Sequence, residues 1–200
     1  MRTDFAVGEP DVNPYRLLTA VVVPRPIAWV STVSEDGVVN LAPHSFYTVA
    51  CARPPIVQFS SVGKKDTLRN VLATGEFVVN LAPAPLLEQV NNSAARFAPE
   101  ESEVEELGIA MEPSLLVRPP RVVASPVSIE CTVHSTNELG DSTVVLGDVR
   151  MISVADHVLS GSHPDFALLD PLARLGKDEW ALHAEVLSVP RPARPEDIGA

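Results

Sequence analysis

Cysteine and aromatic residues are scarce in this chain. Only two cysteines occur among the 200 residues, and aromatic residues make up 5%. Cys51 and Cys131 lie in apolar, strand-like surroundings and form no Cys-x-x-Cys motif, so we expect two reduced core residues in a cytoplasmic protein and no metal site. No apolar run reaches the ~20 residues that a membrane span needs. The N-terminus lacks the apolar segment of a signal peptide.

Positive charge is also scarce. The 15 Lys and Arg residues stand against 26 Asp and Glu residues, which gives a formal net charge of −11. Nucleic acids and anionic membranes are bound by clustered cations, so we expect neither as a partner. Only Lys64 and Lys65 concentrate positive charge, and this pair suits one phosphate better than a polymer. Residues 99–106 carry five glutamates and are interpreted as a solvated acidic turn of helix.

The remaining composition is that of a folded protein. Hydrophobic residues make up 46% of the chain, which excludes general disorder. A length of 200 residues fits one domain over residues 1–200, with its core at about 15–183. We expect residues 1–14 to form a surface arm and the proline-rich residues 190–200 to form a loose tail.

A predicted hairpin organises the first part of the chain. Residues 27–33 read as a strand, Asp36-Gly37 suits a tight turn, and residues 38–41 form the return strand. Pro43 cannot donate a ladder hydrogen bond, so pairing should stop there. A polar group follows: His44, Ser45 and Thr48. This end is either a place where backbone N–H groups hold a small ligand or an ordinary surface loop.

A second motif joins a strand to a helix. Residues 56–61 read as a buried strand, and a helix begins near Asp66 or Thr67 and ends at Gly75. Its expected apolar face is Leu68, Val71 and Leu72. Lysines, hydroxyls and a helix N-terminus together suit a phosphate monoester. A capped surface helix with solvated lysines explains the same residues.

The later segments add strands without βαβ alternation. Residues 76–82 form a strand interrupted by Asn80, which needs a backbone or a ligand partner. A helix is predicted over residues 86–97. Two long strands follow at 127–136 and 142–152, with Gly147 marking a bulge or barrel corner. The prediction is a mainly β fold, an antiparallel barrel with two or three outer helices.

Six motifs, in order and over most of the chain, resemble the flavin reductase-like, FMN-binding split-barrel family. They lie at residues 24–32, 40–46, 65–70, 75–81, 126–131 and 174–176. The resemblance implies a split β-barrel that forms a homodimer and binds FMN near the interface. At residues 177–180 this chain has Lys-Asp-Glu-Trp where the family often has glycines and a tyrosine, which leaves nicotinamide or acceptor docking open.

The resemblance also implies a site map. The ring of the flavin would meet Asn40, Leu41, Ala42 and Ser45. The phosphate segment would comprise Ser60, Ser61, Lys65, Asp66 and Thr67. Asn80 would lie on a strand near the flavin. Arg174 would attract a nicotinamide phosphate or FMN, or form a salt bridge to an acidic neighbour.

The implied activity is that of an FMN-dependent oxidoreductase of the flavin reductase type. It would reduce flavin with NADH or NADPH and pass electrons to an unknown acceptor or monooxygenase partner. Because flavin itself accepts the hydride, no acid–base set is required. His44 is the nearest proton-handling candidate, and an ordinary loop or interface histidine is the alternative. The other functions left open are an FMN carrier or electron-transfer protein without a nicotinamide site, and a binding module that has lost the flavin.

Overall fold

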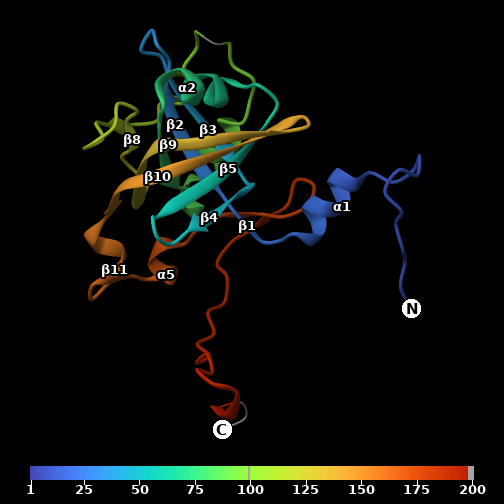
Figure 1. Ribbon diagram of the computed structural model, residues 1–200. Coiled ribbons are helices and arrows are strands. Elements are labelled where there is room, and N and C mark those ends of the chain that lie inside the picture. Colours follow the sequence, from blue (N-terminus) through green and yellow to red (C-terminus); the bar gives the residue numbers. More distant parts are fainter. Residues whose placement is uncertain (99, 198–200) are drawn as a thin grey trace.

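The fold is built on one antiparallel sheet, as the computed structural model shows for residues 1–98 and 100–197 (Figure 1). The sheet has seven strands in the order β3-β2-β6-β9-β10-β5-β4. These strands are β2 (Ala28–Val33), β3 (Val39–His44), β4 (Tyr47–Cys51), β5 (Ile56–Val62), β6 (Glu76–Leu81), β9 (Val127–Leu139) and β10 (Ser142–Val154). The predicted mainly β fold is confirmed.

Short elements surround this sheet. The helical segments are α1 (Pro14–Val21), α2 (Asp66–Thr74), η1 (Ala84–Leu86), α3 (Leu87–Asn92), α4 (Glu103–Glu106), η2 (Asp156–Val158), α5 (Phe166–Leu169) and η3 (Pro195–Asp197). Three small sheets pair β1 (Arg25–Pro26) with β13 (Ala173–Arg174) and β14 (Trp180–Ala181), β7 (Met111–Glu112) with β8 (Arg121–Val122), and β11 (Leu159–Ser160) with β12 (His163–Pro164).

The barrel is split between its two edge strands, β3 and β4. The chain passes from one edge to the other through Ser45 and Phe46. At this corner the Ser60 N–H donates to the Phe46 carbonyl (2.9 Å), which extends the pairing of β4 with β5, while β3 and β5 form no ladder with each other among the described residues. The sheet therefore stays open at one place, and that opening carries the polar residues of the first hairpin.

Both faces of β2 are buried. Ala28 and Val30 pack with Phe59 and Phe77 in one cluster, and Trp29 packs in a second cluster on the opposite face. The Trp29 indole N–H donates to Ser93 Oγ (2.9 Å). This strand therefore joins the barrel interior to the outer helices.

Gly147 marks a predicted irregularity that the structure confirms. The register between β9 and β10 shifts at Leu146/Gly147. A Cβ at Gly147 would collide with the ring of Phe77. Only glycine therefore lets β10 pass the aromatic core at this point.

Three predictions about elements are wrong in detail. Strand β3 continues through Pro43 to His44, because an edge strand has no second neighbour that needs the missing N–H. Leu72 of α2 is 58% exposed, while Leu68 and Val71 are buried. The helix predicted over residues 86–97 ends at Asn92, where consecutive Asn and Ser residues favour a turn over further helix.

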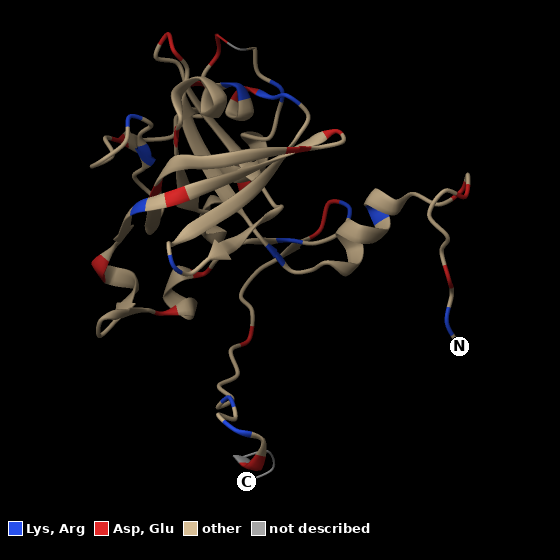
Figure 2. Ribbon diagram, in the orientation of Figure 1, with Lys and Arg blue, Asp and Glu red and all other residues tan. Residues whose placement is uncertain are grey.

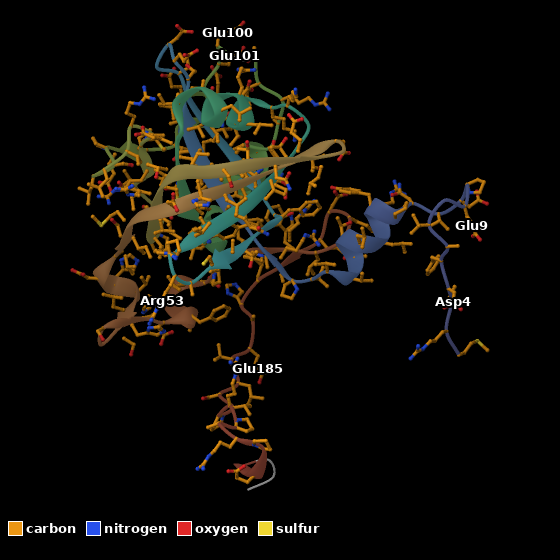
Figure 3. All side chains as sticks on the ribbon, viewed as in Figure 1. Asp4, Glu9, Arg53, Glu100, Glu101 and Glu185 are labelled. Atoms are coloured by element: carbon orange, nitrogen blue, oxygen red, sulfur yellow. The ribbon has the colours of Figure 1, made fainter. Side chains whose placement is uncertain are left out.

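Both chain ends extend away from the sheet (Figure 3). Asp4 and Glu9 lie on the N-terminal segment, and Glu185 lies on the C-terminal segment. Residues 198–200 of the predicted tail lie outside the described residues. Within residues 1–98 and 100–197, none of the helices combines the length and apolar character needed to cross a membrane.

Candidate functional site

A cleft of about 600 Å³ opens where the barrel is split. Its walls come from the end of β3, the loop between β5 and α2, residues 93–97 and Glu103. Eight residues predicted for the site line it: Asn40, Ala42, His44, Ser45, Ser60, Lys65, Asp66 and Thr67. In Figure 2 blue segments beside α2 mark cations at this end of an otherwise acidic protein.

One wall of the cleft is suited to an anion. Strand β5 ends at Val62, Gly63 turns the chain with φ of 76°, and exposed Lys64 and Lys65 follow. Lys65 is the N-cap of α2, and no side chain of the described residues caps the first N–H groups of this nine-residue helix. These N–H groups and the lysine charges are therefore available to a phosphate.

A buried network connects the two walls. Asn40 on β3 contacts Thr67 Oγ1 on α2 at 3.0 Å. The hydrogen bonds are best satisfied when the Asn40 amide nitrogen donates to Glu103 Oε1 (3.2 Å) and its oxygen accepts from Thr67. The Leu41 N–H donates to Glu103 Oε2 (3.0 Å), and Ser102 Oγ donates to the Val39 carbonyl (2.7 Å). The start of α4 thus covers the free edge of β3.

Glu103 corrects the prediction of a solvated acidic turn of helix. Glu100, Glu101, Glu105 and Glu106 are exposed, but Glu103 is 5% exposed and lines the cleft. Burial raises its pKa, although the Leu41 N–H acts in the opposite direction. The sequence offered no signal for this contact, because 62 residues separate the partners. Pro99, the first residue of the predicted turn, lies outside the described residues.

His44 is a buried, neutral imidazole in the cleft wall. Burial lowers its pKa to about 4, and the charge of Lys65 acts in the same direction. Nδ1 faces the Ser60 carbonyl oxygen (3.4 Å), so the neutral ring carries its proton there. Nε2 is buried and has no hydrogen-bond partner among the residues described. The ring can therefore accept a hydrogen bond through Nε2 but holds no acidic proton to give at neutral pH.

Four residues predicted for the site do not line the cleft. Leu41 is buried, and its N–H is taken by Glu103. Ser61 is buried and donates to the Gly63 carbonyl (3.0 Å). Asn80 donates to the Trp29 carbonyl (3.0 Å) and accepts from the Val122 N–H (2.9 Å), so its amide is used within the protein. Arg174 lies in an adjoining corner with Trp180.

Sequence reasoning missed Arg25, which fixes the rim of the cleft. Its guanidinium donates to the carbonyls of Thr19, Val22 (2.8 Å) and Leu175 (2.7 Å). Its Nε lies 3.5 Å from Ser45 Oγ in the cleft wall. The sequence pattern that could have indicated Arg25 is its place between Pro24 and Pro26, because a residue before proline has an extended backbone and here its long side chain points inward.

The family is decided by a match to the model of the flavin reductase like domain over residues 20–171. The chain belongs to this flavin reductase-like family. A protein of Halalkalibacterium halodurans, BH2278, is 40% identical over 190 residues, which cover 89% of this chain and 90% of that protein. The reductase subunit HsaB of a flavin-dependent monooxygenase from Mycobacterium tuberculosis is 33% identical over 127 residues, 64% of each chain.

Solved structures of this flavin reductase-like type share the whole architecture. Nitrilotriacetate monooxygenase component B from Bacillus cereus has a TM-score of 0.86 at 28% identity, covering 94% of this chain and all of that chain. The 2-nitrobenzoate 2-nitroreductase NbaA from Pseudomonas fluorescens has a TM-score of 0.88 at 26% identity, covering 96% and 97%. The family and these neighbours support a flavin-related redox function.

The residues present fit a flavin mononucleotide. The cleft is within the size range of small-molecule sites. It combines an anion-binding wall at Lys65 with a strand end at Ala42 and Ser45, where a flat ring can lie against backbone. Nε2 of His44, which has no partner in the described part of the chain, adds an acceptor to the same wall.

Proposed function

We propose that this member of the flavin reductase-like family is an FMN-binding oxidoreductase that reduces its flavin with NADH or NADPH. The observation that supports this best is the continuity of the cleft. One cavity is lined both by Lys64 and Lys65 before α2 and by Ala42 and Ser45 at the end of β3. In a flavin mononucleotide, the phosphate would meet the lysines and the ring would meet the strand end.

Each end of the cleft has a defined task in this proposal. Lys65 and the uncapped N–H groups of α2 bind the phosphate, and Thr67 is held in place by Asn40. The strand end at Ala42 and Ser45 supports the ring. Arg25 fixes this strand end by tying α1 and the segment after β13 to Ser45. The phosphate thus provides affinity and the strand end provides orientation.

The chemistry requires little from acid–base side chains. Bound flavin supplies the hydride acceptor, and the protein supplies placement and electrostatics. The neutral His44 offers Nε2 to a donor and adds no positive charge to the cleft. Buried Glu103 holds Leu41 and Asn40 on the edge of β3, which keeps the wall of the cleft in one geometry.

The electron acceptor and the assembly are part of the same proposal. HsaB and nitrilotriacetate monooxygenase component B are named as parts of monooxygenase systems, and NbaA as a nitroreductase. By analogy, this chain passes electrons to an oxygenase partner or to a small organic acceptor.

Helix α1 exposes an apolar face formed by Leu18, Val21 and nearby Val22. A second copy of the chain can cover this face, which would give a cytoplasmic homodimer with FMN near the interface.

An anaerobic reduction experiment tests this function. Purified protein loaded with FMN is mixed rapidly with NADH and, separately, with NADPH, and the absorbance of the oxidised flavin is followed. We expect bleaching with at least one of the two at a rate well above that of free FMN. Stable FMN binding without bleaching by either nucleotide would replace the reductase with an FMN carrier or electron-transfer protein. A protein that leaves FMN fluorescence unchanged would contradict flavin binding itself.

A further inference from the structure

The corner beside the flavin cleft holds two arginines with different surroundings. Arg25 on β1 lies opposite Arg174 on β13 in the antiparallel register. The Arg25 guanidinium donates to three backbone carbonyls, so its hydrogen-bonding capacity is largely used. In contrast, Arg174 Nη2 donates to the Lys177 carbonyl (2.8 Å), and its buried Nη1 has no partner in the described part of the chain.

The charge of Arg174 is only weakly compensated. Its ionic partner is Asp178 at 3.7 Å, a fully exposed side chain whose charge is strongly screened by solvent. Its guanidinium carbon lies 4.7 Å from the centre of the Trp180 ring. Contact with the face of an indole leaves the N–H groups in the plane of a guanidinium able to donate to an anion. In a chain of net charge −11, two facing arginines form a local positive site.

Arg174 and Trp180 line two cavities. The inner cavity, of about 150 Å³, is bounded by Pro43, Ser45 and Ala94, which also line the flavin cleft. The outer cavity, of about 620 Å³, opens toward Glu88 and Asp178. A small molecule held by Arg174 in the inner cavity would therefore be next to the proposed flavin site. The inner volume admits one small ring and is too small for a dinucleotide.

We propose that Arg174 and Trp180 form a subsite for a small aromatic carboxylate that docks beside the flavin as an acceptor through a reducible ring substituent such as a nitro group. That nitro group would take two electrons from the reduced flavin and two protons, giving a nitroso group and water. The guanidinium binds the carboxylate through two parallel N–H donors, a geometry that an ammonium cannot supply. The indole and Pro43 provide an apolar surface for the ring. Ser45 belongs to both cavities and marks the passage between them. This inference rests on the proposed function, because it names the kind of acceptor that would meet the flavin.

Benzoate is a suitable probe, because it carries the ring and the carboxylate without redox chemistry. Its binding to FMN-loaded protein is measured by titration calorimetry and by the change in flavin absorbance. We expect saturable binding to the wild-type protein, weakened about tenfold or more by Arg174→Gln, the loss expected for a charge-assisted bidentate contact. Arg118→Gln is the matched control, since Arg118 is exposed and pairs with Glu76 away from this corner. It should leave benzoate binding unchanged.

A second variant protects the test against misfolding. Trp180→Leu keeps Arg174 but removes the aromatic surface, and it should weaken benzoate about threefold to tenfold. Circular dichroism and FMN binding of each variant show whether the fold is intact. Equal benzoate affinity in folded Arg174→Gln, or no saturable binding to the wild-type protein, would overturn the subsite.

The remaining outcomes separate the two proposals. Binding of NADP⁺ that depends on Arg174, with no binding of benzoate, would assign the corner to the nicotinamide substrate and overturn the aromatic-carboxylate proposal. FMN binding with no benzoate binding would leave the flavin function intact and remove the subsite. Arg174-dependent benzoate binding by protein that does not bind FMN would support the subsite and contradict the flavin function.

Discussion

Two asparagines lie on the two strands that flank β2, and they show how differently this protein uses buried polar groups. Asn80 on β6 pairs with Trp29, and Asn40 on β3 pairs with Thr32. Asn80 is fully buried in the middle of the sheet, and its amide is bonded on both sides within the protein. Asn40 is 6% exposed on an edge strand, where its amide joins Thr67 and Glu103 at the cleft.

The comparison separates stability from binding. Inside the sheet, the Asn80 amide is paired on both sides, and removing it leaves buried backbone groups unsatisfied. In the cleft wall, Nε2 of His44 has no partner within residues 1–98 and 100–197, and Lys65 is exposed. We therefore expect substitutions inside the sheet to change the free energy of unfolding and substitutions in the cleft to change ligand affinity.

Removing the Asn80 amide should have the largest effect on stability. Asn80→Ala leaves the Val122 N–H and the Trp29 carbonyl without their side-chain partners, so the free energy of unfolding should fall by about 3 kcal/mol. Urea denaturation measures this change. The folded fraction should bind FMN with wild-type affinity. A loss of FMN affinity with unchanged stability would instead place Asn80 in the binding site.

Acid should destabilise the protein through His44. Its folded pKa of about 4 lies below the ordinary value of 6.5, so the unfolded chain binds more protons between these pH values. Stability is therefore lost as the pH falls from 6.5 to 4, by up to about 3 kcal/mol. Glu103 acts in the opposite sense, because its raised pKa favours the folded state at low pH.

The contribution of His44 to the loss of stability in acid is obtained by comparing the wild-type protein with a variant that lacks this imidazole. Denaturation midpoints of the wild-type protein and of His44→Phe are compared at pH 7 and pH 4.5, and the variant should lose less stability on acidification. His157→Phe, at an exposed position, is the matched control and should behave like the wild-type protein. Identical pH dependence in all three proteins would show that His44 is not held neutral by burial.

Lys65→Gln should weaken FMN binding about tenfold, the value of one charge-assisted contact to a phosphate. Riboflavin lacks the phosphate, so its affinity should be the same for the variant and the wild-type protein. Fluorescence titration measures both ligands. Equal losses for FMN and riboflavin would move Lys65 from the phosphate end to the ring.

Glu103→Gln should have the smallest effect and the opposite sign. Its amide oxygen can still accept from Leu41, and the Asn40 amide can turn to accept from the new N–H. Stability should change little, and FMN should bind about threefold tighter because one negative charge leaves the cleft. Calorimetric titration checks the sign. Weaker FMN binding would show that the Glu103 carboxylate itself contacts the flavin.

Local patterns predicted much of this structure. The hairpin predicted over residues 27–41 and the strand-to-helix segment at residues 56–75 follow from turn residues and alternating apolar residues, and both are present in the structure. Gly75 ends α2 with a φ of 72°, as expected for a helix-terminating glycine. These features are set by residues that are close together in the sequence, so the sequence alone predicts them.

Contacts between distant segments were not predictable in the same way. Glu103 stands in a run of glutamates, and only folding brings it to Leu41. Asn80 and Asn40 look alike in sequence, and their strands decide which of them meets the cleft. Pro43 was expected to end β3, but the edge position of this strand removes the need for its N–H. Position within the sheet, and not residue type, accounts for these differences.

Equilibrium titration of the flavin-free protein with FMN, followed by fluorescence quenching, tests the central claim most directly. We predict saturable binding of FMN at one site per chain, with riboflavin weaker by more than the tenfold expected for Lys65 alone, because riboflavin loses both Lys65 and the N-terminus of α2. Equal affinities for FMN and riboflavin, or no quenching by either, would contradict a cleft built around a flavin phosphate.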